Sequence, residues 1–179
     1  MNKTVAITAA PEAGPPEGSV PEGFVALREP PGFVGVNGPL YMRYERGTEG
    51  QPQTNLVQMG FRVEARHCNP MGNLHGGMMA TFGDMLLAFS ANRKNKVARQ
   101  HFLPTISLQL DYLSPGRLGA WIQGEAQVLR ATRSMVFMHG LVTADGEPAA
   151  RLSGVLKLGA TFKSLGFDPK AAASADPAA

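Results

Sequence analysis

Hydrophobic and polar residues alternate with a period of two over residues 56–65, which is typical of a strand with one buried face. The apolar positions of this stretch are Val57, Met59, Phe61, Val63 and Ala65. Similar patterns predict further strands over residues 106–112, 119–130, 133–144 and 149–162, and a short one around residues 40–44. Turn sequences such as Asp145-Gly146 separate the late strands, so we expect consecutive strands to run antiparallel.

One long helix is predicted from about His75 to Asn92, after a loop over residues 66–74. Its apolar residues recur at helical spacing, namely Met78, Phe82, Met85, Leu86 and Phe89. An adjacent face carries small residues, and the only charge between residues 76 and 92 is Asp84. A helix that is apolar or small nearly all round is expected to be buried. The sequence therefore predicts an α+β fold, in which a curved antiparallel sheet wraps around one central helix.

The proline distribution divides the 179-residue chain into a body and less regular ends. Eight of the fourteen prolines lie in the first 52 residues. We expect a mobile tail over residues 1–23, a single domain over 24–165 and a C-terminal tail over 166–179. Within the domain, residues 24–54 are an irregular lead with a short helix and one strand. The apolar stretch at residues 5–10 is too short for a signal peptide, so we expect a cytoplasmic protein.

The charge and cysteine content exclude several classes of partner. The formal net charge of +3 is too small to imply a nucleic-acid ligand, and the proline-broken lead does not fit a helix-turn-helix. No apolar run is long enough to span a membrane. One cysteine and four histidines argue against a closed structural zinc site, and we expect no metal. A small anionic ligand remains compatible with this balance.

Two features of the predicted helix indicate chemistry. Gly76 and Gly77 at its start would let a ligand approach the free N–H groups of the first turn, where an oxyanion could bind; they could equally allow tight packing of helix on sheet. Asp84 could be a catalytic base or nucleophile, or a carboxylate satisfied by backbone donors. Asp84 lies eight residues after Gly76, or about 12 Å along the helix, too far to act on the same carbonyl. Two antiparallel helices from two chains could bring one Asp84 opposite the other Gly76.

Other candidates have plausible structural explanations. Arg93, Lys94, Lys96 and Arg99 follow the helix and could favour its C-terminal end or contact the phosphates of an anionic ligand. Arg117, Arg130 and Arg133 could serve the same purpose. Cys68 beside His67 suggests a nucleophile–base pair, but adjacent residues of an extended chain point to opposite sides, so we interpret this cysteine as inert.

The stretch HCNPMGNLHGGMMATFGD, residues 67–84, resembles the signature of hotdog-fold acyl-CoA thioesterases of the phenylacetate-pathway (PaaI-like) type. The segments DYLSP, PGRLG, RATRS and ADGEPAARLSG are similar too, so that the resemblance covers about residues 55–162. It implies a hotdog fold and hydrolysis of an acyl-CoA to a free acid and coenzyme A. It also implies a homotetramer, and no cofactor beyond the coenzyme A of the substrate.

The resemblance also assigns roles to positions of this chain. Asp84 matches the carboxylate that activates water or attacks the thioester, and Gly76 matches the N–H that polarises the carbonyl. Asn69 matches a loop amide that positions water or substrate, His75 the motif histidine, and Thr105 a hydroxyl that assists the water. Residues expected to bind substrate are Gly77, Arg93, Arg117 and Arg133. In this family Asp comes from one subunit and Asn and Gly from the other, so a homodimer would form the site.

Two other functions remain compatible with this fold. The first is a non-catalytic acyl-CoA-binding or regulatory protein. The second is a hotdog hydratase or dehydratase, whose relatives use an Asp–His pair that this sequence does not show. The retention of Asp84 and Asn69 favours hydrolysis.

Overall fold

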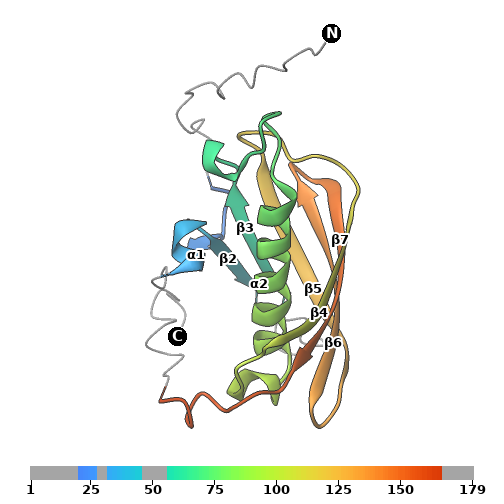
Figure 1. The fold of residues 1–179 in the computed structure, drawn as a ribbon. Helices are drawn as coiled ribbons and strands as arrows, with labels where there is room; N and C mark the ends of the chain where they lie inside the picture. Colours follow the sequence, from blue (N-terminus) through green and yellow to red (C-terminus); the bar gives the residue numbers. More distant parts are fainter. Residues whose placement is uncertain (1–19, 28–31, 46–55, 167–179) are drawn as a thin grey trace.

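The computed structural model describes residues 20–27, 32–45 and 56–166. Of the tails expected over residues 1–23 and 166–179, residues 1–19 and 167–179 lie outside this part of the chain. One seven-stranded antiparallel sheet curves around a single long helix, α2 (Gly76–Lys94), as Figure 1 shows. No helix of the described residues is long and apolar enough to cross a membrane. The expected arrangement of a curved sheet on one helix is therefore confirmed.

The elements follow the predicted order with small shifts in their ends. The strands are β1 (Val25–Ala26), β2 (Tyr41–Glu45), β3 (Leu56–Arg62), β4 (Thr105–Tyr112), β5 (Trp121–Ala131), β6 (Met135–Ala144) and β7 (Glu147–Lys157). Besides α2, the helices are the short α1 (Phe33–Val36) and the 3-10 turns η1 (Ala65–His67) and η2 (Ala98–Gln100). The lead thus contributes two strands and one helical turn to the domain.

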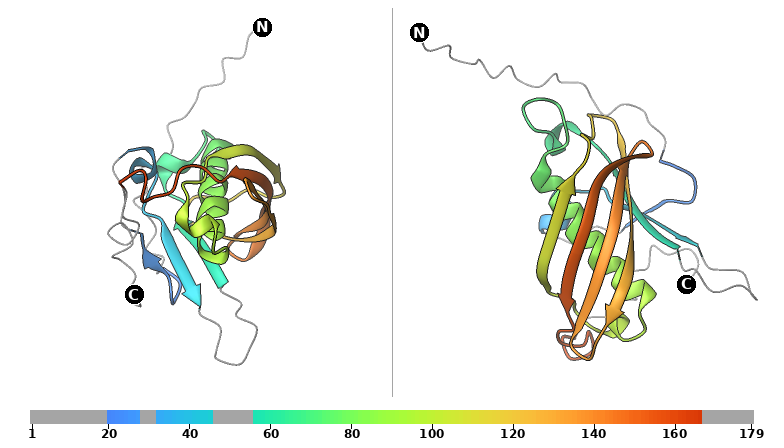
Figure 2. Two further views of the ribbon diagram at one scale, coloured as in Figure 1. Left: turned by 90° about the horizontal axis from the view of Figure 1, so that it is seen from below. Right: turned by 90° about the vertical axis from the view of Figure 1, so that its right-hand side faces the viewer.

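The order of the strands in the sheet differs from their order along the sequence. The strands lie in the order β1-β2-β3-β5-β6-β7-β4, so β4 pairs with β7 and not with its neighbour in sequence, β5. Figure 2 shows β4 at one side of the sheet, next to β7. The chain leaves α2, forms β4 at the far edge, and then returns to the middle of the sheet as β5. Alternation predicts strands but carries no information on which strand lies beside which.

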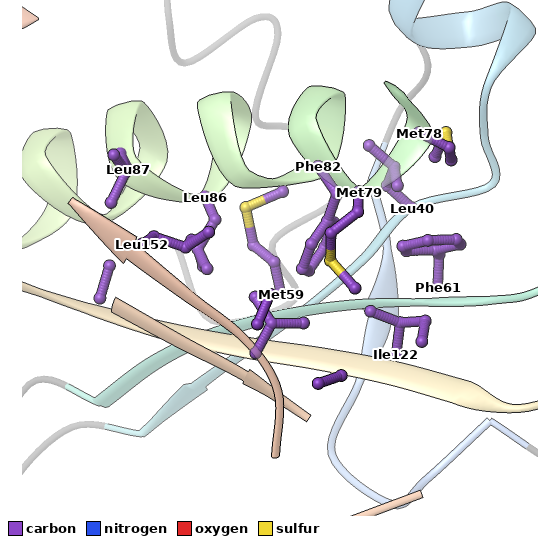
Figure 3. Close-up of a cluster of buried hydrophobic side chains, with 14 of the residues drawn as sticks. Leu40, Met59, Phe61, Met78, Met79, Phe82, Leu86, Leu87, Ile122 and Leu152 are labelled. Carbon is purple, nitrogen blue, oxygen red and sulfur yellow. The ribbon is translucent and has the colours of Figure 1, made fainter. Parts of the chain in front are cut away.

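The core lies between α2 and the concave face of the sheet (Figure 3). Phe82, Leu86 and Leu87 of α2 are fully buried, and they pack with Phe61 and Leu152 from the sheet. Two strand glycines let the helix come close: a Cβ on Gly124 would lie 2.4 Å from Leu86, and one on Gly154 would lie 2.5 Å from Leu87. These glycines are explained by close helix–sheet contact.

The expectation that α2 is buried nearly all round holds for one side only. Its buried residues share the stripe that faces the sheet, namely Met78, Met79, Phe82, Gly83, Leu86, Leu87, Ser90 and Ala91. Ala80, Thr81, Asp84 and Ala88, on the other side, are only partly buried in the single chain. The helix therefore presents a face of small side chains, with one carboxylate, that the described part of the chain covers only in part.

Candidate active site

The start of α2 leaves one backbone donor free. His75 is the N-cap: its N–H donates to the carbonyl of His67 at 2.8 Å, and its Nδ1 accepts from the N–H of Gly77 at 2.9 Å. The N–H of Gly76 has no acceptor among the described residues. A free N–H at the positive end of a 19-residue helix is suited to bind a partial negative charge. His75 thus shapes the helix start, and Gly76 supplies its open donor.

The loop before α2 is held by Asn69. Its side-chain oxygen accepts from the N–H of Met71 at 2.9 Å and from that of Asn73 at 3.2 Å. Its own N–H donates to the carbonyl of Asn73 at 2.7 Å. These bonds use the acceptor of the side-chain amide and leave its NH₂ group as a donor. Asn69 therefore closes the loop and keeps donors to offer a ligand.

Asn69 and Gly76 border one cavity of about 360 Å³. The two residues are joined there by side chains from the loop, from α2 and from the end of β4. The lining residues are Asn69, Asn73, Leu74, Gly76, Met79, Tyr112, Leu113, Ser114, Pro115 and Gly116. Its walls combine apolar side chains with amide, hydroxyl and backbone polar groups in nearly equal share, and small-molecule sites use such polar groups to orient a ligand. The structure thus brings two of the predicted site residues together at one pocket.

Asp84 and Thr105 form a second pair. The Thr105 hydroxyl donates to Oδ1 of Asp84 at 2.5 Å, although the two residues are 21 positions apart. Asp84 is half-buried on α2, and Thr105 is the first residue of β4. A short hydrogen bond to a carboxylate fixes its orientation while leaving its other oxygen available. This arrangement is suited to holding a base in place.

A β-bulge turns Thr105 toward Asp84. Thr105 is opposite Leu156, which is fully buried, whereas Ser107 is opposite Val155, the next residue along β7. Strict alternation would place Thr105 on the same side as Ser107; the extra residue of the bulge moves it to the side of the helix. The bulge also leaves Ile106, expected on the buried face, 56% exposed. That expectation from alternation was wrong at Ile106, and Tyr112, the last apolar position of the same pattern, is exposed as well.

The two pairs are separate within one chain. Asp84 does not line the cavity at Gly76, and eight residues of helix separate them by about 12 Å. Asn69 and Gly76 lie toward the end of β4 that carries Tyr112, and Asp84 lies at the end that carries Thr105. A single chain therefore places its oxyanion donors and its carboxylate apart, as the helix spacing predicted.

The structure distributes the predicted substrate-binding residues unevenly. Arg117 pairs by a backbone bridge with Asn73, a residue that lines the cavity, and Gly77 follows the free donor; each therefore lies next to a lining residue. Arg93 is on the last turn of α2, with its guanidinium 5.8 Å from the centre of the Tyr44 ring, and about 25 Å along the helix from Gly76. Arg133 lies in the exposed turn between β5 and β6. Only Gly77 and Arg117 lie beside the pocket of their own chain.

Cys68 is not built as a nucleophile. Its thiol donates to the carbonyl of Glu64 at 3.4 Å, and burial raises the pKa of Cys68 above its ordinary value. The neighbouring imidazole is engaged elsewhere, because Nδ1 of His67 accepts from the N–H of Glu64 at 3.1 Å. A protonated, half-buried thiol without a base fits an inert cysteine.

Sequence reasoning did not select Tyr112 as a site residue. Its hydroxyl donates to the carbonyl of Gly76 at 2.9 Å, and its ring lines the cavity. The turn Ser114-Pro115-Gly116, just after it, brings this strand end against the loop before α2, since the N–H of Leu74 donates to the carbonyl of Gly116 at 2.7 Å. The sequence feature that could have identified Tyr112 is its place at the end of a predicted strand, just before the turn Ser114-Pro115-Gly116.

Comparisons with known proteins relate this chain to thioesterases. Residues 71–150 match the family model of the thioesterase superfamily. A Pseudomonas aeruginosa protein that carries an esterase name is 27% identical over 140 residues, which is 78% of this chain and 98% of that protein. Human acyl-coenzyme A thioesterase 13 is 31% identical over 78 residues, which is 42% of this chain and 52% of that protein.

Solved structures share the fold. Zebrafish thioesterase superfamily member 2 superposes with a TM-score of 0.61 at 26% identity, over 73% of this chain and 89% of that one. The phenylacetic acid degradation protein PaaI of Thermus thermophilus superposes with a TM-score of 0.52 at 20% identity, over 65% of this chain and 91% of that one. The hotdog fold expected from residues 67–84 is therefore confirmed, and the match at residues 71–150 includes Gly76, Asp84 and Thr105.

Proposed function

We propose that this chain, a member of the thioesterase superfamily, hydrolyses an acyl-coenzyme A thioester to a free carboxylic acid and coenzyme A. The observation that carries the proposal is the placement of two half-sites along β4. The free Gly76 N–H and the Asn69 amide border a cavity at one end, and Asp84 is oriented by Thr105 at the other. A relative that is named acyl-coenzyme A thioesterase supports an acyl-coenzyme A as the substrate.

Pairing of β4 with a second copy of the chain would complete the site. β4 is the last strand of the sheet, and its outer edge has no strand partner within residues 20–27, 32–45 and 56–166. If two copies pair antiparallel about the midpoint of the strand, Thr105 of one copy lies opposite Tyr112 of the other. That symmetry carries each Asp84 toward the cavity at Gly76 of the second copy. The proposed active form is therefore a dimer with two equivalent sites, and the small-residue face of α2 is available for further assembly to a tetramer.

The reaction follows from these groups. The thioester carbonyl oxygen accepts from the Gly76 N–H and the Asn69 NH₂ group, which stabilise the negative charge that develops there. Asp84 removes a proton from water as the water oxygen bonds to the carbonyl carbon. The tetrahedral intermediate then breaks its C–S bond, and the coenzyme A thiolate leaves and takes up a proton. In the alternative that the resemblance leaves open, the Asp84 carboxylate itself attacks the carbonyl carbon, the C–S bond breaks and the coenzyme A thiolate leaves and takes up a proton. Water then hydrolyses the resulting anhydride, which releases the acid and restores Asp84.

No cofactor is required for this chemistry beyond the coenzyme A of the substrate, because a thioester carbonyl is electrophilic enough for a water, a base and an oxyanion donor. The phosphates of coenzyme A need cationic partners. Arg117 is the candidate in the same chain, since it pairs with Asn73, a residue that lines the cavity. Arg93 and Arg133 could reach the ligand only from a second copy.

A thiol-release assay over a panel of acyl-CoA substrates tests the proposal. Asp84→Asn keeps the shape of the side chain but removes the base, so turnover should fall by about 10²–10⁴-fold. Glu147→Gln is the matched control, because it removes an exposed carboxylate at the start of β7 and should leave turnover unchanged. Full activity in folded Asp84→Asn would refute the mechanism. Tight acyl-CoA binding without thiol release in the native chain would instead favour the non-catalytic binding protein.

A further inference from the structure

Tyr112 contacts the same residue that is proposed to polarise the thioester. Its phenolic hydroxyl donates to the carbonyl of Gly76 at 2.9 Å, across 36 positions of sequence. Its ring lies so close to the first turn of α2 that a Cβ placed on Gly76 would be 3.4 Å from the hydroxyl oxygen and 3.5 Å from the ring. Tyr112 is nevertheless 58% exposed, so its position is not explained by burial in the core.

The hydroxyl fixes the least constrained part of the helix. Gly76 and Gly77 begin α2, and glycine has more backbone freedom to lose than any other residue. The N-cap bond from Gly77 to His75 and the bond from Tyr112 to the Gly76 carbonyl restrain the same peptide, the one that joins Gly76 to Gly77. The free N–H of Gly76 belongs to the preceding peptide, whose carbonyl, that of His75, accepts from the N–H groups of the next helical turn. The peptides on both sides of the Gly76 Cα are therefore held, and its N–H keeps one direction. A donor held in advance of the reaction stabilises an oxyanion better than a mobile one.

The ring defines the width of the cavity beside that donor. Tyr112, Met79 and Leu74 line the same cavity as Gly76. An acyl group whose carbonyl oxygen reaches Gly76 must place its first carbon atoms near this ring, since ring and donor belong to adjacent walls of one cavity. A flat aromatic wall accepts a straight chain or another planar group more easily than a branch at that position.

We propose that Tyr112 is a positioning and selectivity residue: its hydroxyl aligns the Gly76 donor, and its ring excludes acyl groups that branch next to the thioester. The inference rests on the proposed function, because it concerns the same site. It assigns the substrates to the class of acyl groups that are unbranched or planar next to the carbonyl.

Two substitutions separate the two roles. Tyr112→Phe removes the hydroxyl and keeps the ring, whereas Tyr112→Ala removes both. The substrates are butyryl-CoA and isobutyryl-CoA, which have the same atoms and differ only in the branch. Tyr41→Phe is the control, because Tyr41 lies on β2 at the other side of the sheet, against Trp121.

We expect Tyr112→Phe to lower kcat by roughly 3–10-fold, the effect of one lost hydrogen bond, with an unchanged ratio of kcat/KM for the two substrates. The Gly76 amide signal in a ¹H–¹⁵N NMR spectrum should shift, and its hydrogen exchange should become faster. Tyr112→Ala should change the ratio by at least about 10-fold in favour of isobutyryl-CoA, which is the usual effect of one methyl group in a pocket. Tyr41→Phe should change none of these values.

An unchanged substrate ratio in folded Tyr112→Ala would overturn the selectivity role, and an unchanged Gly76 signal and kcat in Tyr112→Phe would overturn the positioning role. Either result leaves the proposed function intact if the native chain still releases thiol. If the native chain releases no thiol, the proposed function fails, and the test of Tyr112 becomes a binding measurement. Kd is then measured for butyryl-CoA and isobutyryl-CoA analogues in which CH₂ replaces the thioester sulfur, with the native chain and with Tyr112→Ala. The inference about Tyr112 is overturned if both proteins bind the two analogues equally well, or if neither analogue binds.

Discussion

The two edges of the sheet end in opposite ways. At one edge, β1 has only two residues and covers β2, a short strand of the kind that keeps an edge from pairing with other chains. At the other edge, β4 has eight residues, has no strand partner on its outer side among the described residues, and exposes Ile106 and Tyr112. Both pairs of candidate catalytic groups lie along β4. One edge, the closed edge, thus completes the fold of the chain, whereas the other, the open edge, is the edge that we propose to complete the site.

The closed edge is held by aromatic contacts. The Trp121 ring packs edge-on against Phe24 with 5.1 Å between ring centres, and against Tyr41 at 5.6 Å. The guanidinium of Arg62 lies 5.3 Å from the same ring. Gly60 makes room for Trp121, since a Cβ there would be 2.4 Å from it. These contacts attach the lead segment to the sheet, and none of them involves a candidate catalytic group.

The largest expected effect comes from a charge on the open edge. Ile106→Glu introduces a carboxylate where β4 is proposed to meet its copy, on a side chain that is 56% exposed in the single chain. We expect the dimer to dissociate and turnover to fall by about 10²–10⁴-fold, because Asp84 is then separated from the Gly76 donor of the other copy. Sedimentation and thiol release measure the two effects.

Val25→Glu is the matched change at the closed edge, where the side chain is 41% exposed on β1. It should leave both oligomeric state and turnover unchanged. If Ile106→Glu remains a fully active dimer, or if the native chain is an active monomer, then β4 is not the interface and the comparison between the edges loses its functional meaning.

The next effect concerns stability and belongs to the closed edge. Trp121→Ala removes the ring that joins Phe24, Tyr41 and Arg62, and a large buried aromatic replaced by alanine typically costs about 3–5 kcal/mol. We expect the free energy of unfolding in urea to fall by this amount, while kcat of the folded fraction changes little. A large loss of kcat at full folding would show that the closed edge also supports the chemistry.

Sequence alone predicted the open edge in part. Alternation located β4 to within a residue, and the lone charge of α2 selected Asp84. The pairing of β4 with β7 was not predictable, since side-chain period says which face is buried but not which strand is adjacent. The bulge could not be predicted either, because it is one extra residue in the pairing of β4 with β7, and that pairing was unknown. The resemblance pointed to Thr105 as a hydroxyl that assists the water, and its contact with Asp84 became visible only in the fold.

The closed edge was harder to predict. Prolines made residues 24–54 look irregular, and only one strand was expected there, around residues 40–44. β1 has two residues, too few for any periodic pattern. Its partner β2 corresponds to the strand expected around residues 40–44, and it pairs on its other side with β3. The packing of Phe24 on Trp121 joins positions that are 97 residues apart. Contacts of this range come from tertiary structure and leave no local signal.

A smaller effect on catalysis tests whether the open edge orients the base. Thr105→Ala removes the hydrogen bond to Asp84, and a bond to a charged group is worth enough to lower kcat by roughly 10–100-fold. Thr105→Ser keeps a hydroxyl at the bulge and should recover most of the activity. Steady-state kinetics on both variants measure the difference. Equal activity of the two would mean that the bond seen in the structure does not orient the base.

The smallest expected effect is on pH dependence, at a residue that contacts both regions. His67 is buried against Phe61, with its ring centre 5.3 Å away, and its carbonyl accepts the N–H of His75 at the start of the site. Burial, together with the positive charge of Arg66, lowers the pKa of His67 below its ordinary value of 6.5. The folded state therefore holds His67 neutral, with Nδ1 accepting from the N–H of Glu64.

Because the unfolded chain takes up this proton more readily, the contribution of His67 to stability is complete above about pH 6.5 and is lost as the pH falls through the window below it. We expect the free energy of unfolding of the native chain to decline between pH 7.5 and pH 5, and His67→Gln, which cannot be protonated, to lose less over the same range. Urea titrations of both proteins at the two pH values measure this difference. Identical declines would assign the pH dependence to carboxylates elsewhere, and would leave His67 as a packing residue between the closed edge and the start of α2.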